Sequence, residues 1–124
     1  MNVGKDNIIV KKSYSFALGI IGLYKTLVEN KKEFVLSKQM LRSGTSIGAN
    51  INEAVTSESK KDFIHKLSIA VKEVRETGYW LNLLKDSEYI TEENFNQLNK
   101  DCEELARILN SIILTTKERY FKTV

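Results

Sequence analysis

Proline is absent from this chain of 124 residues, and glycine occurs only six times. Because proline interrupts helices and glycine weakens them, long helices are permitted along the whole sequence. A single cysteine, Cys102, excludes an intramolecular disulfide and fits a reducing cytoplasm. No window approaches the roughly 18 consecutive apolar residues of a membrane span, and the N-terminal residues lack the apolar run of a signal peptide. These absences predict a cytoplasmic protein with no contact to the membrane.

Four segments carry apolar residues at the alternating three- and four-residue steps of an amphipathic helix. They cover residues 9–31, 37–57, 60–86 and 92–121. Thr91 is placed to cap the fourth segment, and Asp6 or Asn7 to cap the first. Short connections between long helices force neighbouring helices to run antiparallel. The sequence therefore predicts an all-α fold with one domain over residues 1–124, an antiparallel up-down-up-down four-helix bundle.

Small residues gather in the second segment, in the stretch RSGTSIGANINEA over residues 42–54. Gly44 and Gly48 lie one helical turn apart there, and each glycine inside a helix costs about 1 kcal/mol relative to alanine. A phosphate-binding glycine loop would need a lysine after the glycines and a strand before them, and the sequence has neither. Close packing of a neighbouring helix is the better interpretation.

Polar side chains form a second stripe on each of the two middle segments. One stripe follows Ser43, Ser46, Asn50, Glu53 and Ser57, and the other follows Ile69, Glu73, Glu76, Trp80 and Leu83. Glutamates between an isoleucine and a tryptophan suit a polar contact between subunits, with Arg42 or Arg75 as the counter-charge. The alternative is an ordinary solvent-exposed helix surface. The predicted oligomer interface consists of Arg42, Ser46, Asn50, Glu53, Glu73, Glu76 and Trp80.

The stretch LRSGTSIGANINEA, followed by KKDFIHKLSIAVKEVRETGYWLNLL, closely resembles the four-helix bundle family first noticed in intervening sequences of 23S ribosomal RNA genes. The resemblance extends over essentially the whole chain. It implies a bundle that assembles into a ring-like homopentamer. The family is also similar to the accessory protein of diversity-generating retroelements, a basic pentamer that binds nucleic acid and a reverse transcriptase. This chain departs from that protein in its net charge, which is only +3.

Enzymatic and metal-binding functions find little support in the sequence. A di-iron bundle needs two Glu-x-x-His motifs, whereas the one histidine, His65, is preceded at that offset by Asp62. Cys102 lies on an apolar stripe, which favours a buried small hydrophobe over a reactive thiol. The prediction is a protein that is not an enzyme, with no catalytic residues, metal or cofactor.

Charge is unevenly distributed along the predicted bundle. One end carries eight basic and four acidic side chains, a net charge of +4, and the other end carries −2. A ring of lysines can bind phosphate backbones without reading sequence, although lysines at helix ends also serve solubility. The predicted nucleic-acid-binding residues are Lys11, Lys12, Lys60, Lys61, Lys117, Arg119 and Lys122. Two function classes stay open, an oligomeric accessory protein that binds RNA or DNA, and a scaffold that binds a protein partner.

Overall fold

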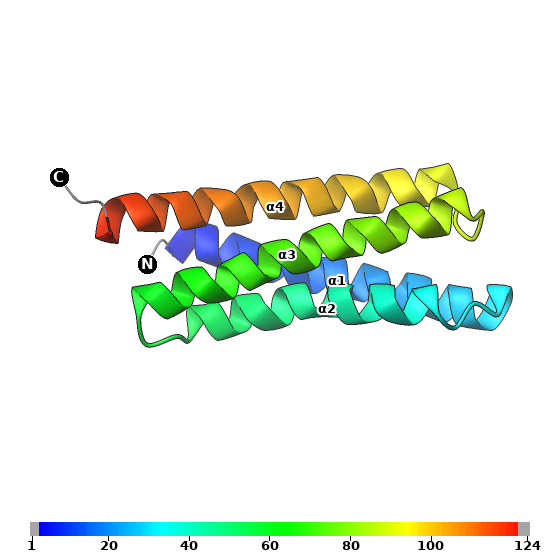
Figure 1. Cartoon of the computed structure of the whole chain (residues 1–124), viewed down its shortest axis with the longest axis horizontal. Helices are drawn as coiled ribbons and strands as arrows, with labels where there is room; N and C mark the ends of the chain where they lie inside the picture. The colour runs from blue at the N-terminus through cyan, green and yellow to red at the C-terminus, as the bar shows by residue number, and fades with distance from the viewer. Residues whose placement is uncertain (1–2, 122–124) are drawn as a thin grey trace.

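The computed structural model describes residues 3–121, with side chains from Ile8 onward. Four helices, α1 (Val3–Lys31), α2 (Leu36–Val55), α3 (Lys60–Asp86) and α4 (Glu92–Tyr120), account for nearly all of these residues. Consecutive helices run in opposite directions along one long axis (Figure 1). No strand occurs within residues 3–121. The predicted all-α four-helix bundle is therefore confirmed, with residues 42–54 inside α2.

Side-chain caps begin two of the helices. The Thr91 side chain accepts a hydrogen bond from the backbone N–H of Asn94, as the sequence predicted, and Ser59 accepts one from Asp62 at the start of α3. The predicted cap of the first helix was wrong. Because α1 already begins at Val3, Asp6 and Asn7 lie within its first turns.

An unforeseen glutamate caps α2. The carboxylate of Glu33 accepts hydrogen bonds from the backbone N–H groups of Val35 (3.1 Å), Leu36 (2.9 Å) and Ser37 (2.7 Å). Burial raises the pKa of Glu33, but the three hydrogen bonds stabilise the carboxylate more strongly, and its pKa falls below 4.5. A negative charge at this position also complements the N-terminal end of the helix dipole.

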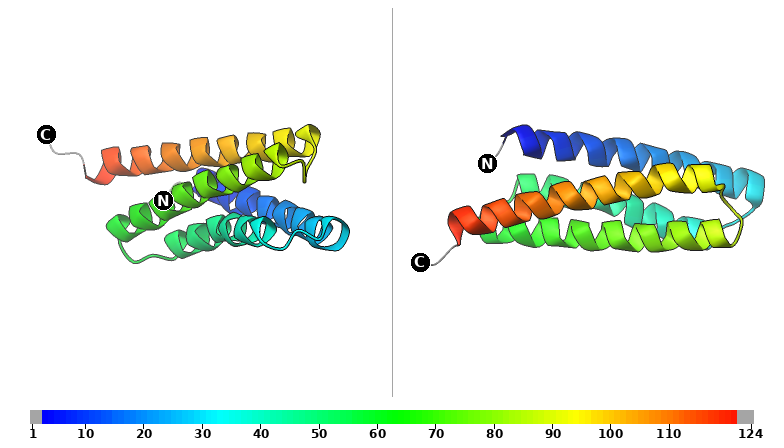
Figure 2. Two further views of the ribbon diagram at one scale, coloured as in Figure 1. Left: turned by 45° about the vertical axis from the view of Figure 1, so that its right-hand side comes forward. Right: turned by 90° about the horizontal axis from the view of Figure 1, so that it is seen from above.

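The core follows the predicted apolar stripes. Each helix contacts its two neighbours, so that α1 and α3 lie diagonally opposite, and Figure 2 shows this arrangement from two further sides. Contact is most extensive between α2 and α3 and least extensive between α1 and α4. Fully buried residues from all four helices include Ile20, Ile47, Leu81 and Leu109. The bundle is thus tight on one side and more open along the line between α1 and α4.

The two glycines of α2 face α1, but they differ in how closely it approaches. A Cβ atom at Gly44 would lie 2.9 Å from Cγ2 of Ile20, which is shorter than real contacts allow. At Gly48 the nearest atom, Oγ of Ser13, would lie 3.4 Å away, an ordinary van der Waals distance. The packing interpretation is therefore confirmed at Gly44 and holds only weakly at Gly48.

Candidate functional site: a polar face and a basic end

Four of the predicted interface residues form one network between α2 and α3. The guanidinium of Arg42 donates a hydrogen bond to Oε2 of Glu76, and its Nη1 lies 3.7 Å from Oε2 of Glu73. The indole Nε1 of Trp80 donates to the same oxygen of Glu76 at 3.1 Å. Arg42 is thus the counter-charge to both glutamates. We call the surface formed by the predicted interface residues the polar face.

The two glutamates of the polar face experience opposite effects. The hydrogen bond from Trp80 lowers the pKa of Glu76, and this outweighs the effect of burial, with Arg42 lowering it further. For Glu73, burial raises the pKa more than Arg42 lowers it, and the nearby charge of Glu76 raises it again. Oε2 of Glu73 is buried and accepts no hydrogen bond from the residues that the structure describes. Glu76 is therefore the firmly ionised member of the pair.

The remaining residues of the polar face have partners close by. Nδ2 of Asn50 donates to the backbone carbonyl of Ser46 at 2.9 Å, and Lys66 pairs with Glu53 at 3.0 Å. Ser43, which the sequence placed on the same stripe, lies instead in the core, where Oγ1 of Thr77 donates to its Oγ at 2.9 Å. Two cations, Arg42 and Lys66, thus face three carboxylates on this surface, so a second surface that covers it has to supply a hydrogen-bond donor or a positive charge near Glu73.

The predicted basic end is assembled as expected from topology. The start of α1, the connection between α2 and α3, and the end of α4 lie at the same end of the bundle (Figure 1). Lys61, Lys117 and Arg119 are exposed there. Lys11 is also exposed, but it lies about 12 Å along α1 from the first helical residue, because each residue adds 1.5 Å. Lys122 lies outside the described residues.

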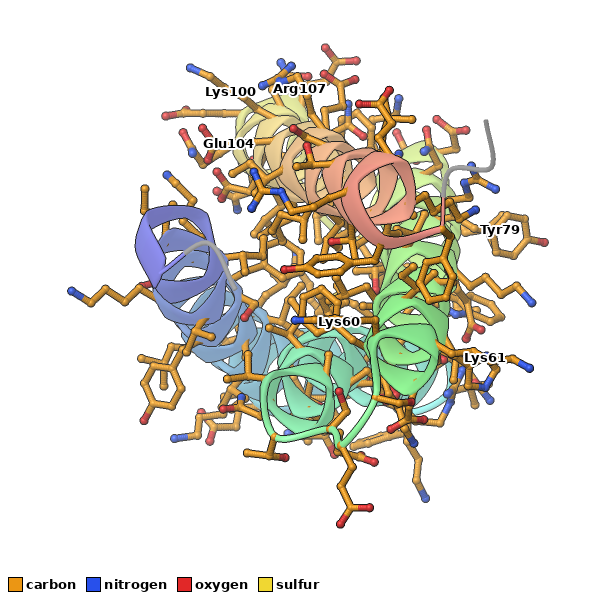
Figure 3. The ribbon with its side chains drawn as sticks, turned by 90° about the vertical axis from the view of Figure 1, so that its left-hand side faces the viewer. Lys60, Lys61, Tyr79, Lys100, Glu104 and Arg107 are labelled. Atoms are coloured by element: carbon orange, nitrogen blue, oxygen red, sulfur yellow. The ribbon has the colours of Figure 1, made fainter. Side chains whose placement is uncertain are left out.

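Two of the predicted basic residues are engaged within the chain. Nζ of Lys60 lies 4.7 Å from the ring centroid of Tyr120 and 6.0 Å from that of Phe63, as cation–π contacts require. Figure 3 shows Lys60 turned toward the middle of the bundle, whereas Lys61 points away from it. Lys12 forms an ion pair with Glu104 at 3.1 Å. The unpaired positive charge of this end is therefore smaller than the sequence predicts.

The exposed apolar side chains of α1 were not predicted from the sequence. Tyr14 is 66% exposed and Leu18 is 54% exposed, one turn apart on the outer side of the helix, and Ile21 follows one turn further and is half-buried. We call Tyr14, Leu18 and Ile21 the α1 ridge. One feature of the sequence could have indicated this ridge. Apolar residues occur around the whole circumference of the first predicted helix, and this pattern is typical of a helix that is covered on all sides.

Hollows between α1 and α4 lie beside this ridge. Two adjacent pockets of about 300 Å³ each share Gly19 and Leu98 among their lining residues. The linings also include Phe16, Leu23 and Leu105. We call these two pockets the α1–α4 groove. Its lining mixes these apolar side chains with polar and charged ones, among them Lys12, Asp101 and Glu104.

No chemical centre emerges from the described residues. Within them, no group of three or more His, Cys, Asp or Glu side chains is arranged to hold a metal ion. Burial raises the pKa of Cys102 to about 12, and the neighbouring Asp101 and Glu103 act in the same direction, so its thiol is a poor nucleophile. None of the four helices, over the residues that the structure describes, has an apolar stretch of membrane-spanning length.

Comparison with known proteins gives a family without an assigned activity. Residues 5–111 match the family model described as 23S rRNA-intervening sequence protein. A crystal structure from Bacteroides thetaiotaomicron, described as a protein with unknown function from the S23 ribosomal protein family, is 56% identical and superposes with a TM-score of 0.88. That similarity covers 89% of this chain and 98% of the other. No curated protein matches. The chain belongs to the 23S rRNA-intervening sequence protein family.

Proposed function

We propose that this protein is a non-enzymatic, self-associating four-helix bundle that binds RNA or DNA weakly and without sequence preference through its basic end. The observation that carries the binding proposal is the exposed group of Lys61, Lys117 and Arg119, brought together from α3 and α4. Among the described residues, none of the three has a carboxylate within ion-pair distance. Such cations attract phosphates by releasing counterions.

Self-association would strengthen this binding. A closed ring in which all copies point the same way gathers the basic ends on one rim, and several weak contacts on one polymer add their free energies. The α1 ridge supports self-association because it leaves large apolar side chains in water. The polar face remains the contact predicted from the sequence. A homopentamer is the assembly that the family resemblance implies.

A charge-reversal experiment tests the binding proposal. We expect Lys61→Glu, Lys117→Glu and Arg119→Glu together to weaken binding to mixed RNA and DNA fragments by at least about tenfold, alike for all sequences. The wild-type affinity should fall steeply with rising salt. Lys60 is left unchanged because its substitution would also remove the ring contacts with Tyr120. The matched control reverses Lys25, Lys31 and Lys38, which are exposed on α1 and α2.

The alternative function has a distinct outcome. If the wild-type protein binds no fragment even at low salt while it still self-associates, the basic end serves solubility, and the scaffold function takes first place. A wild-type protein that binds one sequence much more tightly than all others would also contradict the proposal, since phosphate contacts carry no sequence information.

A further inference from the structure

The charges of α3 are separated between two of its sides. Glu73 and Glu76 face Arg42 on α2, and Lys66 pairs with Glu53 on the same side. Lys72 and Arg75 are exposed and take no part in these pairs. The glutamates that could neutralise neighbouring cations one turn away are thus committed to another helix.

The outer side of α3 consequently carries three cations in line with a histidine and a tyrosine. Lys61, His65, Lys72, Arg75 and Tyr79 are all exposed and follow one another at helical spacing, over about 27 Å. None of the carboxylates in the described part of the chain forms an ion pair with Lys61, Lys72 or Arg75. We call these five residues the α3 line. It begins at the basic end, with Lys61, and continues along the bundle.

The ring of Tyr79 forms the last position of the α3 line, and residues of the polar face support this ring. Tyr79 is 58% exposed, and its ring meets that of Trp80 edge-on, with centroids 5.0 Å apart and planes at 71°. Trp80 is in turn fixed by its hydrogen bond to Glu76, which is held by Arg42. In Figure 3, Tyr79 extends from α3 away from the bundle, on the same side as Lys61.

We propose that the α3 line binds single-stranded nucleic acid, with Lys61, Lys72 and Arg75 on phosphates and Tyr79 stacked on a base; this rests on the proposed function and extends it beyond the basic end. A cationic track with an exposed, supported aromatic ring is the combination that single-strand binders use. A duplex offers phosphates but keeps its bases stacked inside. A membrane surface would require several large, exposed apolar side chains on this side, whereas Ser68 and Asn82 lie beside the line and Leu83, one turn after Tyr79, is only partly exposed.

The single tryptophan makes the test direct. Trp80 is the only tryptophan of the chain, and it touches Tyr79, so its fluorescence reports on this surface. We expect unlabelled single-stranded DNA and RNA oligonucleotides to quench Trp80 emission in a saturable manner. A duplex of equal length should bind at least about tenfold more weakly, because it cannot stack on Tyr79.

Two pairs of variants separate charge from stacking. Lys72→Glu with Arg75→Glu should weaken single-strand binding at least about tenfold. The slope of log affinity against log salt should also become shallower, by the equivalent of about two phosphate contacts. Lys100→Glu with Arg107→Glu makes the same charge change on α4, where both residues are exposed, and should change affinity by less than about threefold. Tyr79→Ala should lose about tenfold for single strands only, and Tyr79→Phe should restore it.

The results distinguish this inference from the proposed function. If wild-type protein binds no nucleic acid, both fail. If it binds but Trp80 emission is unchanged, or the α3 and α4 charge variants lose affinity equally, the α3 line is not the binding surface, and the basic end stands alone. Equal affinity for duplex and single strand would also overturn the stacking role of Tyr79.

Discussion

At the scale of single residues, α2 shows how closely two positions of the same type can differ. Gly44 and Gly48 are one turn apart and both buried, yet only Gly44 lies where Ile20 leaves no room for a Cβ atom. At Gly78 on α3, an added Cβ would meet no neighbouring atom within 4 Å among the described residues. A glycine in a helix is therefore required at Gly44, whereas Gly78 carries only the cost of its backbone freedom.

Alanine substitutions at these two glycines should change the free energy of unfolding in opposite directions. We expect Gly44→Ala to lower the free energy of unfolding by about 1–3 kcal/mol, because Ile20 or the helix must shift. Gly78→Ala should raise it by up to about 1 kcal/mol through better helix propensity. Urea denaturation followed by circular dichroism measures both. Equal effects of the two substitutions would contradict the packing account of α2.

At the scale of the secondary-structure elements, helix ends are set by side chains that lie outside the helices. Thr91 and Ser59 follow the usual capping pattern, which sequence reasoning can find. Glu33 does not, since it lies three residues before α2, and its carboxylate reaches forward to the first N–H groups of the helix. Nothing in the local pattern marks that conformation, in which Lys32 adopts a positive φ of 56°.

The cap on α2 should make stability depend on pH. We expect Glu33→Ala to cost about 1–3 kcal/mol at pH 7, through three lost hydrogen bonds to a charged acceptor. Since the folded-state pKa of Glu33 lies below its ordinary 4.5, its contribution is complete above that pH and is lost as the pH falls through the folded-state pKa.

Thermal unfolding of the wild type and of Glu33→Ala, measured between pH 7 and pH 3, follows this dependence. The difference between the two proteins should shrink toward the acid end. A difference that stays constant over that range would show that the charged form of Glu33 does not stabilise α2. Glu29→Ala is a suitable control, because Glu29 is exposed within α1.

At the scale of the whole molecule, the α1 ridge and the α1–α4 groove are different surfaces of one chain. If the ridge of one copy enters the groove of the next, the contact is head-to-tail, and such contacts form a ring when the rotation between successive copies closes. The charges of the groove are mixed, since Asp101 lines it together with Lys11 and the Lys12–Glu104 ion pair, so the apolar ridge carries the argument for this contact.

Mixing two variants tests the head-to-tail contact. We expect Leu18→Glu, which damages the ridge, and Gly22→Trp, which fills the groove, each to be mainly monomeric by light scattering. Within residues 8–121, no neighbouring atom lies within 4 Å of a Cβ added at Gly22, so the tryptophan should leave the bundle folded. Mixed together, they should form a 1:1 dimer through the one intact ridge and the one intact groove. Leu114→Glu, an equally exposed position on α4, is the control.

Three other results would contradict self-association or the head-to-tail contact. A monomeric wild-type protein at micromolar concentration would refute self-association altogether. If both variants assemble like the wild type, the contact lies elsewhere, and the polar face becomes the first candidate. Absence of the mixed dimer would refute the head-to-tail arrangement.

The sequence by itself determined the fold, because helical periodicity, the lack of proline and short connections leave an antiparallel bundle as the way to bury every stripe. It also located the polar face, since Arg42, Glu73 and Glu76 lie on stripes of helices that are consecutive in the chain. Topology alone brought the basic residues to one end.

Only the tertiary structure decided which of these charges are free and which apolar residues are covered. Lys60 is engaged because Tyr120, sixty residues later, lies beneath it, and Lys12 because α4 brings Glu104 within reach. Lys72 and Arg75 form no ion pair within the described part of the chain, because Arg42, on another helix, binds the nearby glutamates. Such pairings depend on distances between helices, and helical periodicity contains no information about those distances.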